Sequence, residues 1–294
     1  PHTIFLKDSM HHDVFPPLPP TRKEEKLFSR LIAEINPHLV GFSVLSPYVA
    51  VAQRLTRLVK NHNSSTLVIW GGHHVTIAPE ASIHEADIIC RGEGEGALVE
   101  LVECLRDAKP YDSIRNLWVQ KEGAVVQNPM RPLIQDLDTL PFFAIAEKTF
   151  FFINHNRLRT FDRLLLRPII IMGTGRGCPL ACSFCINGKL RKLYEGLGFF
   201  SRRRSVGSAF QEIKEKISVW KSKPNLILFS EECFATEGPW LDEFVARYPR
   251  EIGLPFHVKY HPQLLNAAIL EKLFQAGLEQ LDFGIQSGSD RIRN

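Results

Sequence analysis

Short apolar runs alternate with longer amphipathic stretches in the amino-terminal part of the chain. Positions 2–8, 38–46, 66–72 and 86–93 are apolar, rich in β-branched residues and bounded by small or polar ones, which is typical of strands. Apolar residues recur every three or four positions in 21–35 and 49–60, which predicts helices. Positions 96–107 predict a further helix, and 116–129 predict a hairpin that turns at Glu122-Gly123. This alternation predicts a parallel sheet.

A second alternating series follows a connector. Positions 132–165 contain two prolines early on and show no sustained period, so we expect a connector there. Strands are then predicted at 164–173, 225–232, 256–260 and 278–288, with helices at 204–223, from about 240, and at 266–277. The predicted fold class is therefore α/β. The predicted domains are 1–131 and 166–294, and the second contains four strand-helix units.

Composition and charge narrow the class of protein. Of 294 residues 44% are apolar and 23% are charged, with a net charge of +4. The longest apolar stretch, 164–172, contains Arg167 and Pro168 and falls short of the ~20 residues that a membrane-spanning helix needs. The densest basic run covers only 202–204. We expect a soluble protein that binds neither nucleic acid nor a membrane. The six cysteines, three of them clustered, do not resemble a secreted disulfide framework, so we expect a cytoplasmic location.

The ends of the sequence predict a fragment. The chain lacks an initiator Met and a signal-peptide pattern, and it stops soon after the last predicted strand. We therefore expect a chain truncated at both ends, whose second domain is only part of a (β/α) barrel.

Three of the six cysteines lie within eight residues, as Cys178, Cys182 and Cys185. A structural zinc site normally has four ligands in two close pairs, and no second pair follows here. A redox pair of Cys182 and Cys185 would leave the third thiol unexplained. An iron-sulfur cluster held by three thiolates uses all of them and leaves one iron open. The preceding strand would place the loop at the carboxyl end of the sheet, and Gly173, Gly175 and Gly177 would let the backbone pass close to a cluster.

This loop, with Phe184 just before the last cysteine, resembles the signature of the radical S-adenosylmethionine (SAM) superfamily. The resemblance implies that Cys178, Cys182 and Cys185 hold a 4Fe-4S cluster. The open iron would then bind SAM, and one electron would cleave SAM to methionine and a 5′-deoxyadenosyl radical. It also implies an external electron donor of the flavodoxin or ferredoxin type.

Two further segments resemble SAM-binding parts of that superfamily. The stretch 229–234 ends a strand where the family carries acidic or polar groups that meet the SAM amino group, so Glu231 and Glu232 are both candidates; a solvated strand end is the alternative. The stretch 284–289 resembles the family's glycine-containing strand along SAM, and taken alone it fits any turn. The residues it implicates are Gly284, Gln286, Ser287 and Gly288.

The amino-terminal half resembles the Rossmann-like (flavodoxin-like) cobalamin-binding domain that precedes the radical SAM barrel in one subgroup. The residues that carry the resemblance end adjacent strands, and they are Ser43, Leu45, Gly71 and Gly72. Small residues there would open a crevice for a corrin or its nucleotide tail, although tight turns would use the same residues. The Asp-x-His-x-x-Gly motif that ligates cobalt is missing, and the spacing of His11 and His12 does not replace it. We expect cobalamin bound without a protein His ligand.

The resemblance implies a cobalamin-dependent radical SAM enzyme that methylates an unactivated carbon of a small molecule. Oxidative ring formation by the same two domains is an alternative, and so is an iron-sulfur electron-transfer or binding module without radical chemistry. Cys90 and Cys104 fall in a predicted strand and a predicted helix, so we expect core thiols and no second cluster.

Overall fold

The computed structural model describes residues 2–6, 19–143, 149–160 and 167–293. The chain divides into two compact units, which are described separately. The first consists of residues 1–134, 148–161 and 192–197, and the second of residues 135–147, 162–191 and 198–294. In the described residues, no helix is both long and apolar enough to cross a membrane.

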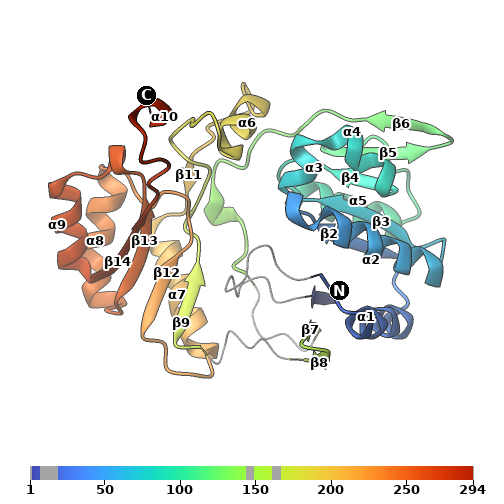
Figure 1. Cartoon of the computed structure of the whole chain (residues 1–294), viewed down its shortest axis with the longest axis horizontal. Helices are drawn as coiled ribbons and strands as arrows, with labels where there is room; N and C mark the ends of the chain where they lie inside the picture. Colours follow the sequence, from blue (N-terminus) through green and yellow to red (C-terminus); the bar gives the residue numbers. More distant parts are fainter. Residues whose placement is uncertain (1, 7–18, 144–148, 161–166, 294) are drawn as a thin grey trace. The chain divides into compact units, whose positions relative to one another are not determined.

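The first unit is built on a five-stranded sheet (Figure 1). Strands β2 (Leu39–Ser43), β3 (Leu67–Gly71) and β4 (Ile88–Cys90) are parallel neighbours, as predicted. The predicted hairpin continues the sheet in antiparallel order as β5 (Leu117–Lys121) and β6 (Ala124–Gln127). The turn between them holds Glu122 and Gly123 at positive φ, which confirms the predicted turn.

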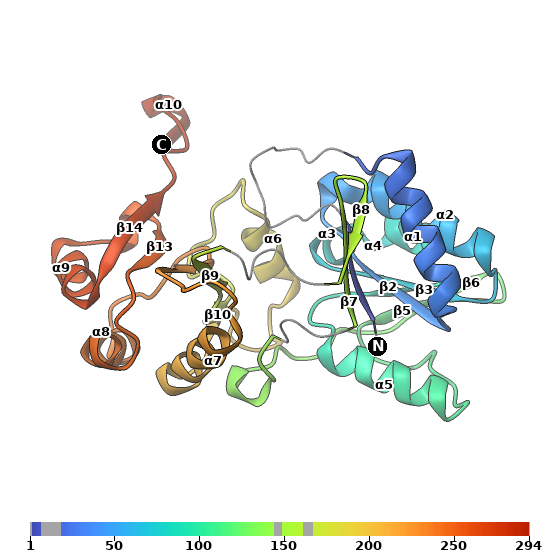
Figure 2. The same ribbon diagram turned by 90° about the horizontal axis from the view of Figure 1, so that it is seen from below.

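Helices cover both faces of this sheet (Figure 2). On one face lie α1 (Arg22–Ile35) and α2 (Val49–His62), whose apolar side chains pack on Val68, Trp70 and Ile89. On the other face lies α5 (Glu95–Arg106), which packs on Ile69 and Ile88. A capping box of Thr21 and Glu24 starts α1. Short helical segments follow β2 and β3, and they are η1 (Ser46–Tyr48), α3 (His73–Ile77), α4 (Pro79–Ser82) and η2 (Ile83–Glu85).

The strand predicted at 2–8 exists but lies outside the main sheet. It is β1 (Thr3–Leu6), which pairs in parallel with β7 (Phe150–Asn154), and β7 pairs with β8 (Arg157–Arg159). The rings of Phe5 and Phe152 stack with their centroids 4.7 Å apart, and Ile153 belongs to the core formed with α1 and α2. The prediction of a parallel sheet that includes this strand is therefore wrong, and 132–165 contains a hairpin that its sequence pattern did not predict.

The second unit contains four parallel strands, which confirms the predicted series. They are β9 (Ile169–Met172), β12 (Leu226–Phe229), β13 (Phe256–Tyr260) and β14 (Leu278–Phe283), in the order β14-β13-β12-β9. Helices α7 (Val206–Val219), α8 (Pro239–Glu251) and α9 (Ala267–Ala276) lie on one face of this sheet (Figures 1 and 2). Ser205 caps α7, and its side chain accepts a hydrogen bond from the Ser208 amide.

The remaining elements of the second unit are short and do not belong to the four-stranded sheet. They are η3 (Leu137–Thr139), β10 (Gly175–Arg176), α6 (Ile186–Leu193), β11 (Arg202–Arg203), η5 (Pro262–Leu264) and α10 (Asp290–Arg293). Strand β10 follows β9 almost at once, and it pairs in antiparallel order with β11, which comes after α6.

Candidate functional site

The three clustered cysteines lie on the loop that follows β9 and β10 and leads into α6. Cys178 is buried, whereas Cys182 and Cys185 are partly exposed. The Cys185 amide donates to Cys182 O at 3.1 Å, and the Arg191 guanidinium donates to Cys178 O. The loop therefore presents two accessible thiols beside one that is fixed at its base.

Gly177 lets the loop pass close to the backbone at Phe200. Its φ is +77°, and a Cβ atom there would lie 2.1 Å from Phe200 O. Any other residue would have to move the loop immediately before Cys178. This glycine is required by the protein's own packing, independently of any ligand.

The cysteines form an electrostatically connected group. Burial raises the pKa of the Cys178 thiol, and the neighbouring Cys185, Cys182 and Glu232 raise it further, against a hydrogen bond from the Leu180 amide that lowers it. In the part of the chain that the structure describes, no three His, Cys, Asp or Glu side chains are arranged to hold a metal ion. Three thiols on one loop still fit iron-sulfur chemistry by donor type, because thiolates are the usual ligands of such clusters.

The two candidate carboxylates lie on the loop after β12, and they differ in burial and in hydrogen bonding. Glu231 is buried, and its Oε1 accepts from the Thr174 amide at 2.7 Å and from the Thr174 hydroxyl. Its Oε2 is buried and accepts no hydrogen bond from the described residues. Glu232 is exposed and lies near enough to Cys178 to raise the pKa of that thiol.

Arg203 completes the environment of Glu231, and sequence reasoning missed it. Its Nη1 donates to Thr174 Oγ1 at 2.7 Å and lies 3.4 Å from Glu231 Oε1, and its Nη2 donates to Phe234 O. The guanidinium lies 4.7 Å from the ring centroid of Trp240. Burial lowers the pKa of Arg203, and the nearby Glu231 carboxylate opposes that shift.

The sheet face opposite the helices carries polar residues on β13 and β14, which sequence reasoning also missed. Phe256, Val258 and Tyr260 pack toward the helices, so the alternate residues His257 and Lys259 point to the other face. His257 Nε2 lies 2.9 Å from Asp282 Oδ2, an ion-pair distance without the alignment of a hydrogen bond. The alternation of FHVKY could have revealed this polar face.

The stretch 284–289 is mostly exposed in the structure. Gly284, Gln286 and Gly288 are exposed beyond the end of the edge strand β14, and Ser287 is partly exposed. The Ser287 hydroxyl accepts from the Ser289 amide at 3.0 Å, which is a local turn. Their expected contact with SAM remains a prediction.

In the first unit, the structure brings the predicted strand-end residues together. Ser43 and Gly71 are register partners of β2 and β3, and the Val44 amide donates to Gly71 O at 2.8 Å. Gly72 has φ +97°, and a Cβ atom there would lie 2.8 Å from Val44 O. The turn itself therefore requires Gly72, while Ser43 and Leu45 are exposed beside it.

Two histidines and two cysteines complete this part of the first unit. His74 follows the turn, and its Nδ1 lies 3.0 Å from Ser46 Oγ, whereas His73 is exposed. Cys90 is buried, and burial raises its pKa to about 11, which confirms the prediction of a core thiol. Cys104 is partly buried and packs at the edge of the α5 core. His11 and His12 lie outside the described residues.

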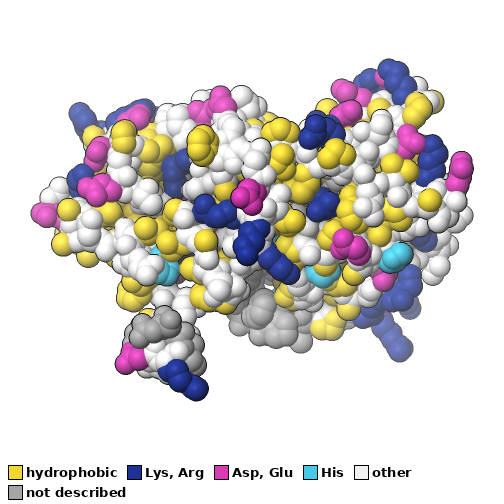
Figure 3. Space-filling view, turned by 90° about the horizontal axis from the view of Figure 1, so that it is seen from above, with side chains coloured by type: hydrophobic (Ala, Val, Ile, Leu, Met, Phe, Trp, Pro, Cys, Tyr) yellow, Lys and Arg dark blue, Asp and Glu magenta, His cyan; other side chains and the backbone are white. Residues whose placement is uncertain are grey.

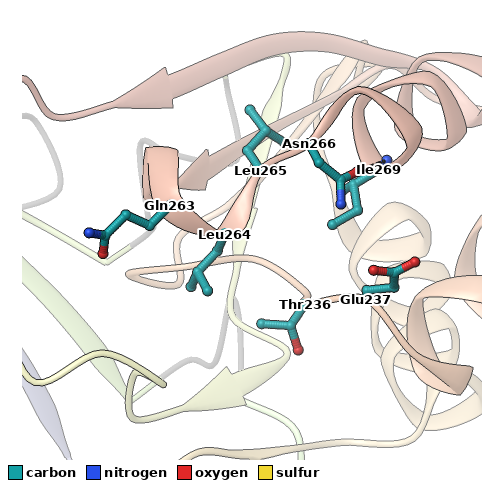
Figure 4. Close-up of a pocket in the computed structure, with 7 residues that line it drawn as sticks. All are labelled: Thr236, Glu237, Gln263, Leu264, Leu265, Asn266 and Ile269. Carbon is teal, nitrogen blue, oxygen red and sulfur yellow. Dashed lines mark hydrogen bonds between the residues drawn. The ribbon is translucent and has the colours of Figure 1, made fainter.

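A small pocket opens among the loops that follow β12 and β13 in the second unit. Its volume is about 280 Å³, and Figure 4 shows seven residues around it, including Glu237 and Asn266. The Asn266 side chain accepts from the Ile269 amide as the cap of α9, so it is already engaged.

On the face shown in Figure 3, basic and acidic side chains are interspersed, with apolar atoms between them.

Comparison with known proteins gives matches in both halves of the chain. The family model described as the B12 binding domain matches residues 5–102, and that of the radical SAM superfamily matches residues 172–294. A methyltransferase of Pyrococcus horikoshii, itself named uncharacterized, is 26% identical over 272 residues, which cover 90% of this chain and 55% of that protein. The anaerobic magnesium-protoporphyrin IX monomethyl ester cyclase of Rubrivivax gelatinosus is 30% identical over 173 residues, covering 55% and 29%.

A solved structure shows the same fold. TsrM of Kitasatospora setae, a radical SAM methyltransferase with tryptophan and a SAM analogue bound, has a TM-score of 0.69 at 16% identity, over 99% of this chain and 60% of that chain. A second structure of TsrM, with cobalamin and a 4Fe-4S cluster bound, has a TM-score of 0.67. This chain spans only about half the length of the first of the curated relatives and less of the second.

Proposed function

Because the chain belongs to the family of radical SAM enzymes that carry an amino-terminal B12-binding domain, we propose that it takes part in cobalamin-dependent methylation of an unactivated carbon. The substrate would be a small molecule, and an external flavodoxin- or ferredoxin-type protein would supply the electron. The proposed domains are 1–131 and 166–294, joined by 132–165, and the proposed location is the cytoplasm. Both relatives named as methyltransferases support this choice of reaction.

The observation that carries the proposal is the loop with three thiols at the carboxyl end of the first strand of a parallel strand-helix series. Cys178, Cys182 and Cys185 would each give one thiolate to the cluster. The partly exposed Cys182 and Cys185 would converge on the buried Cys178 as iron binds. Three thiolates leave one iron without a protein ligand, which is the vacancy that SAM needs.

When bound, the cluster supplies the electron that cleaves SAM, and cobalamin supplies the methyl group. Of the two candidate carboxylates, we assign Glu232 to the SAM ammonium. A ligand can reach only atoms with accessible surface, and the partnerless oxygen of Glu231 has almost none, whereas Glu232 is exposed beside Cys178. Gly284, Gln286, Ser287 and Gly288 stay proposed as contacts to the rest of SAM.

Ser43, Leu45 and Gly71 are the residues that we propose to face cobalamin. The ends of β2 and β3 place an exposed hydroxyl and an exposed apolar side chain beside a glycine, which suits a flat corrin or its nucleotide tail. Gly72 would contribute by shaping the turn that holds them. Cobalt would receive no ligand from a protein His.

Anaerobic reconstitution with iron and sulfide tests the cluster. We expect about four irons per chain, the number in one such cluster, and loss of the brown chromophore when any one of Cys178, Cys182 and Cys185 is replaced by Ala. Cys233→Ala, which changes a buried thiol in the same unit, serves as the control and should retain the cluster. A chromophore that survives the triple replacement would contradict the assignment.

SAM affinity tests the carboxylate. Glu232→Gln should weaken SAM binding to the reconstituted protein by about tenfold, because a charge-assisted contact is lost. Glu237→Gln, at an exposed position of the same loop, is the matched control. Equal affinities of the two variants would remove Glu232 from the site.

Ring formation is the second candidate reaction, and the identity to the Rubrivivax cyclase favours it. Methyl-labelled SAM distinguishes the two reactions. Methylation moves the label into the product, whereas cyclisation leaves the label outside it.

A further inference from the structure

We propose that Arg203 is a positioning residue that fixes the cysteine loop against the end of β12 by holding Glu231 and Thr174 together. This inference rests on the proposed function for its second part, the effect on SAM. None of the three residues would touch the cluster or SAM. We name the group formed by Thr174, Arg203 and Glu231 the loop clamp.

The contacts of the loop clamp converge from three separate segments. Thr174 begins the cysteine loop, Arg203 lies in β11 just before α7, and Glu231 follows β12. One carboxylate oxygen, Glu231 Oε1, accepts from both the amide and the hydroxyl of Thr174 and lies 3.4 Å from the guanidinium. The Thr174 hydroxyl in turn accepts from Arg203 Nη1 at 2.7 Å. Each member thus contacts both of the others.

The chemistry of the loop clamp requires an arginine. The planar guanidinium reaches Thr174 with one nitrogen and Phe234 O with the other while its face lies against Trp240. A lysine ammonium can make only part of this set, because it is a point charge without a planar face. The Glu231 side chain is 3% exposed, so removing its cationic partner would leave a buried charge.

The position of the clamp connects it to the proposed chemistry. Thr174 precedes Cys178 by four residues, and Glu231 is adjacent to Glu232, the proposed SAM contact. The backbone pairing of Gly175 with Arg203 ties the same two segments a second time. The clamp therefore sets where the cysteine loop stands relative to Glu232. Productive SAM binding depends on that separation, because SAM must reach the open iron and the carboxylate together.

Amide hydrogen exchange of the cofactor-free chain is the first test. Arg203→Met should speed exchange at Thr174, whose N–H donates to Glu231, by at least about tenfold. Arg204→Met is the matched control. Arg204 neighbours Arg203, but its guanidinium donates to Leu140 O at 3.1 Å and to Pro141 O at 3.2 Å and not to the clamp. Its backbone amide donates to Thr174 O at 2.8 Å, and the substitution keeps that amide. The control should leave exchange at Thr174 unchanged, and equal exchange rates in the two variants would overturn the clamp.

SAM affinity of the reconstituted chain is the second test. Arg203→Met should retain the iron content of the wild type but bind SAM about tenfold more weakly, and Arg203→Lys should recover part of the loss. Thr174→Val, which removes one hydroxyl at nearly constant volume, should shift affinity in the same direction. Faster exchange at Thr174 with unchanged SAM affinity would refute positioning. A wild type that binds no SAM would instead refute the proposed function, while the exchange result would still decide whether the clamp exists.

Discussion

Replacing Gly177 by Ala should damage the cysteine loop far more than its backbone angle alone explains. Two penalties combine at this position. The left-handed conformation at φ +77° costs a residue with a Cβ about 1 kcal/mol. The new Cβ would also lie 2.1 Å from Phe200 O, so loop and neighbour must separate by about 1 Å, at a typical overpacking cost of about 1–3 kcal/mol. Together these lower the free energy of unfolding by about 2–4 kcal/mol.

Gly196→Ala carries the first penalty alone, so the difference between the two variants gives the second. Gly196 has φ +75°, and an added Cβ would meet nothing within 4 Å, so only the conformational cost of about 1 kcal/mol applies. Urea unfolding of the cofactor-free chains measures both changes. Iron content after anaerobic reconstitution then measures how well the cysteine loop still binds the cluster, because the displaced residue directly precedes Cys178. If the two variants match in stability and in iron content, the close approach at Phe200 does not shape this loop.

Two further predictions concern the first unit. Gly72→Ala should destabilise the chain by about 2 kcal/mol or more, whereas Gly71→Ala, whose Cβ would make only ordinary contacts from 3.8 Å, should leave the free energy of unfolding nearly unchanged. Urea unfolding measures both variants, and equal losses of stability would contradict the prediction. Burial raises the pKa of Cys90 to about 11, so only about 0.1% of this thiol is thiolate at pH 8. In the cofactor-free chain, an alkylating reagent should therefore label the partly exposed Cys182 well before Cys90, as peptide mass spectrometry can measure.

Local patterns were enough to predict the four parallel strands and the three helices packed on them in the second unit. The four-three spacing of apolar residues along α7 places Val206, Phe210 and Ile213 in the core, and the β-rich runs at 226–229 and 256–260 form adjacent strands. Each of these elements is decided within a few residues of sequence. Their order in the sheet, β14-β13-β12-β9, then follows from the general tendency of consecutive strands to be neighbours.

The partner of β1 could not be predicted in the same way. Thr3 pairs with Phe150, so the contact joins positions far apart in the chain, and periodicity carries no such information. The hairpin of β7 and β8 turns at His155 and Asn156, both at positive φ, without the glycine that usually marks such a turn.

The candidate site shows the same difference between residues that local sequence identifies and residues that depend on distant contacts. Spacing alone singled out Cys178, Cys182 and Cys185, because a loop ligand set is local. The choice between Glu231 and Glu232 needed burial, since adjacent carboxylates look alike in a sequence. Arg203 gave no signal, because its role depends on segments that meet only in the folded chain.

The two compact units share the chain in alternating pieces, and this bears on how such proteins can be cut or recombined. The first unit includes the hairpin at 150–159 and the segment 192–197, where Tyr194 packs against Gly92. Expression of residues 1–131 alone would strip β1 of its neighbour and uncover that glycine. Chimaeras that exchange halves between relatives should therefore carry these two inserts along with the amino-terminal half, so that modular shuffling works only when the pieces travel as a set.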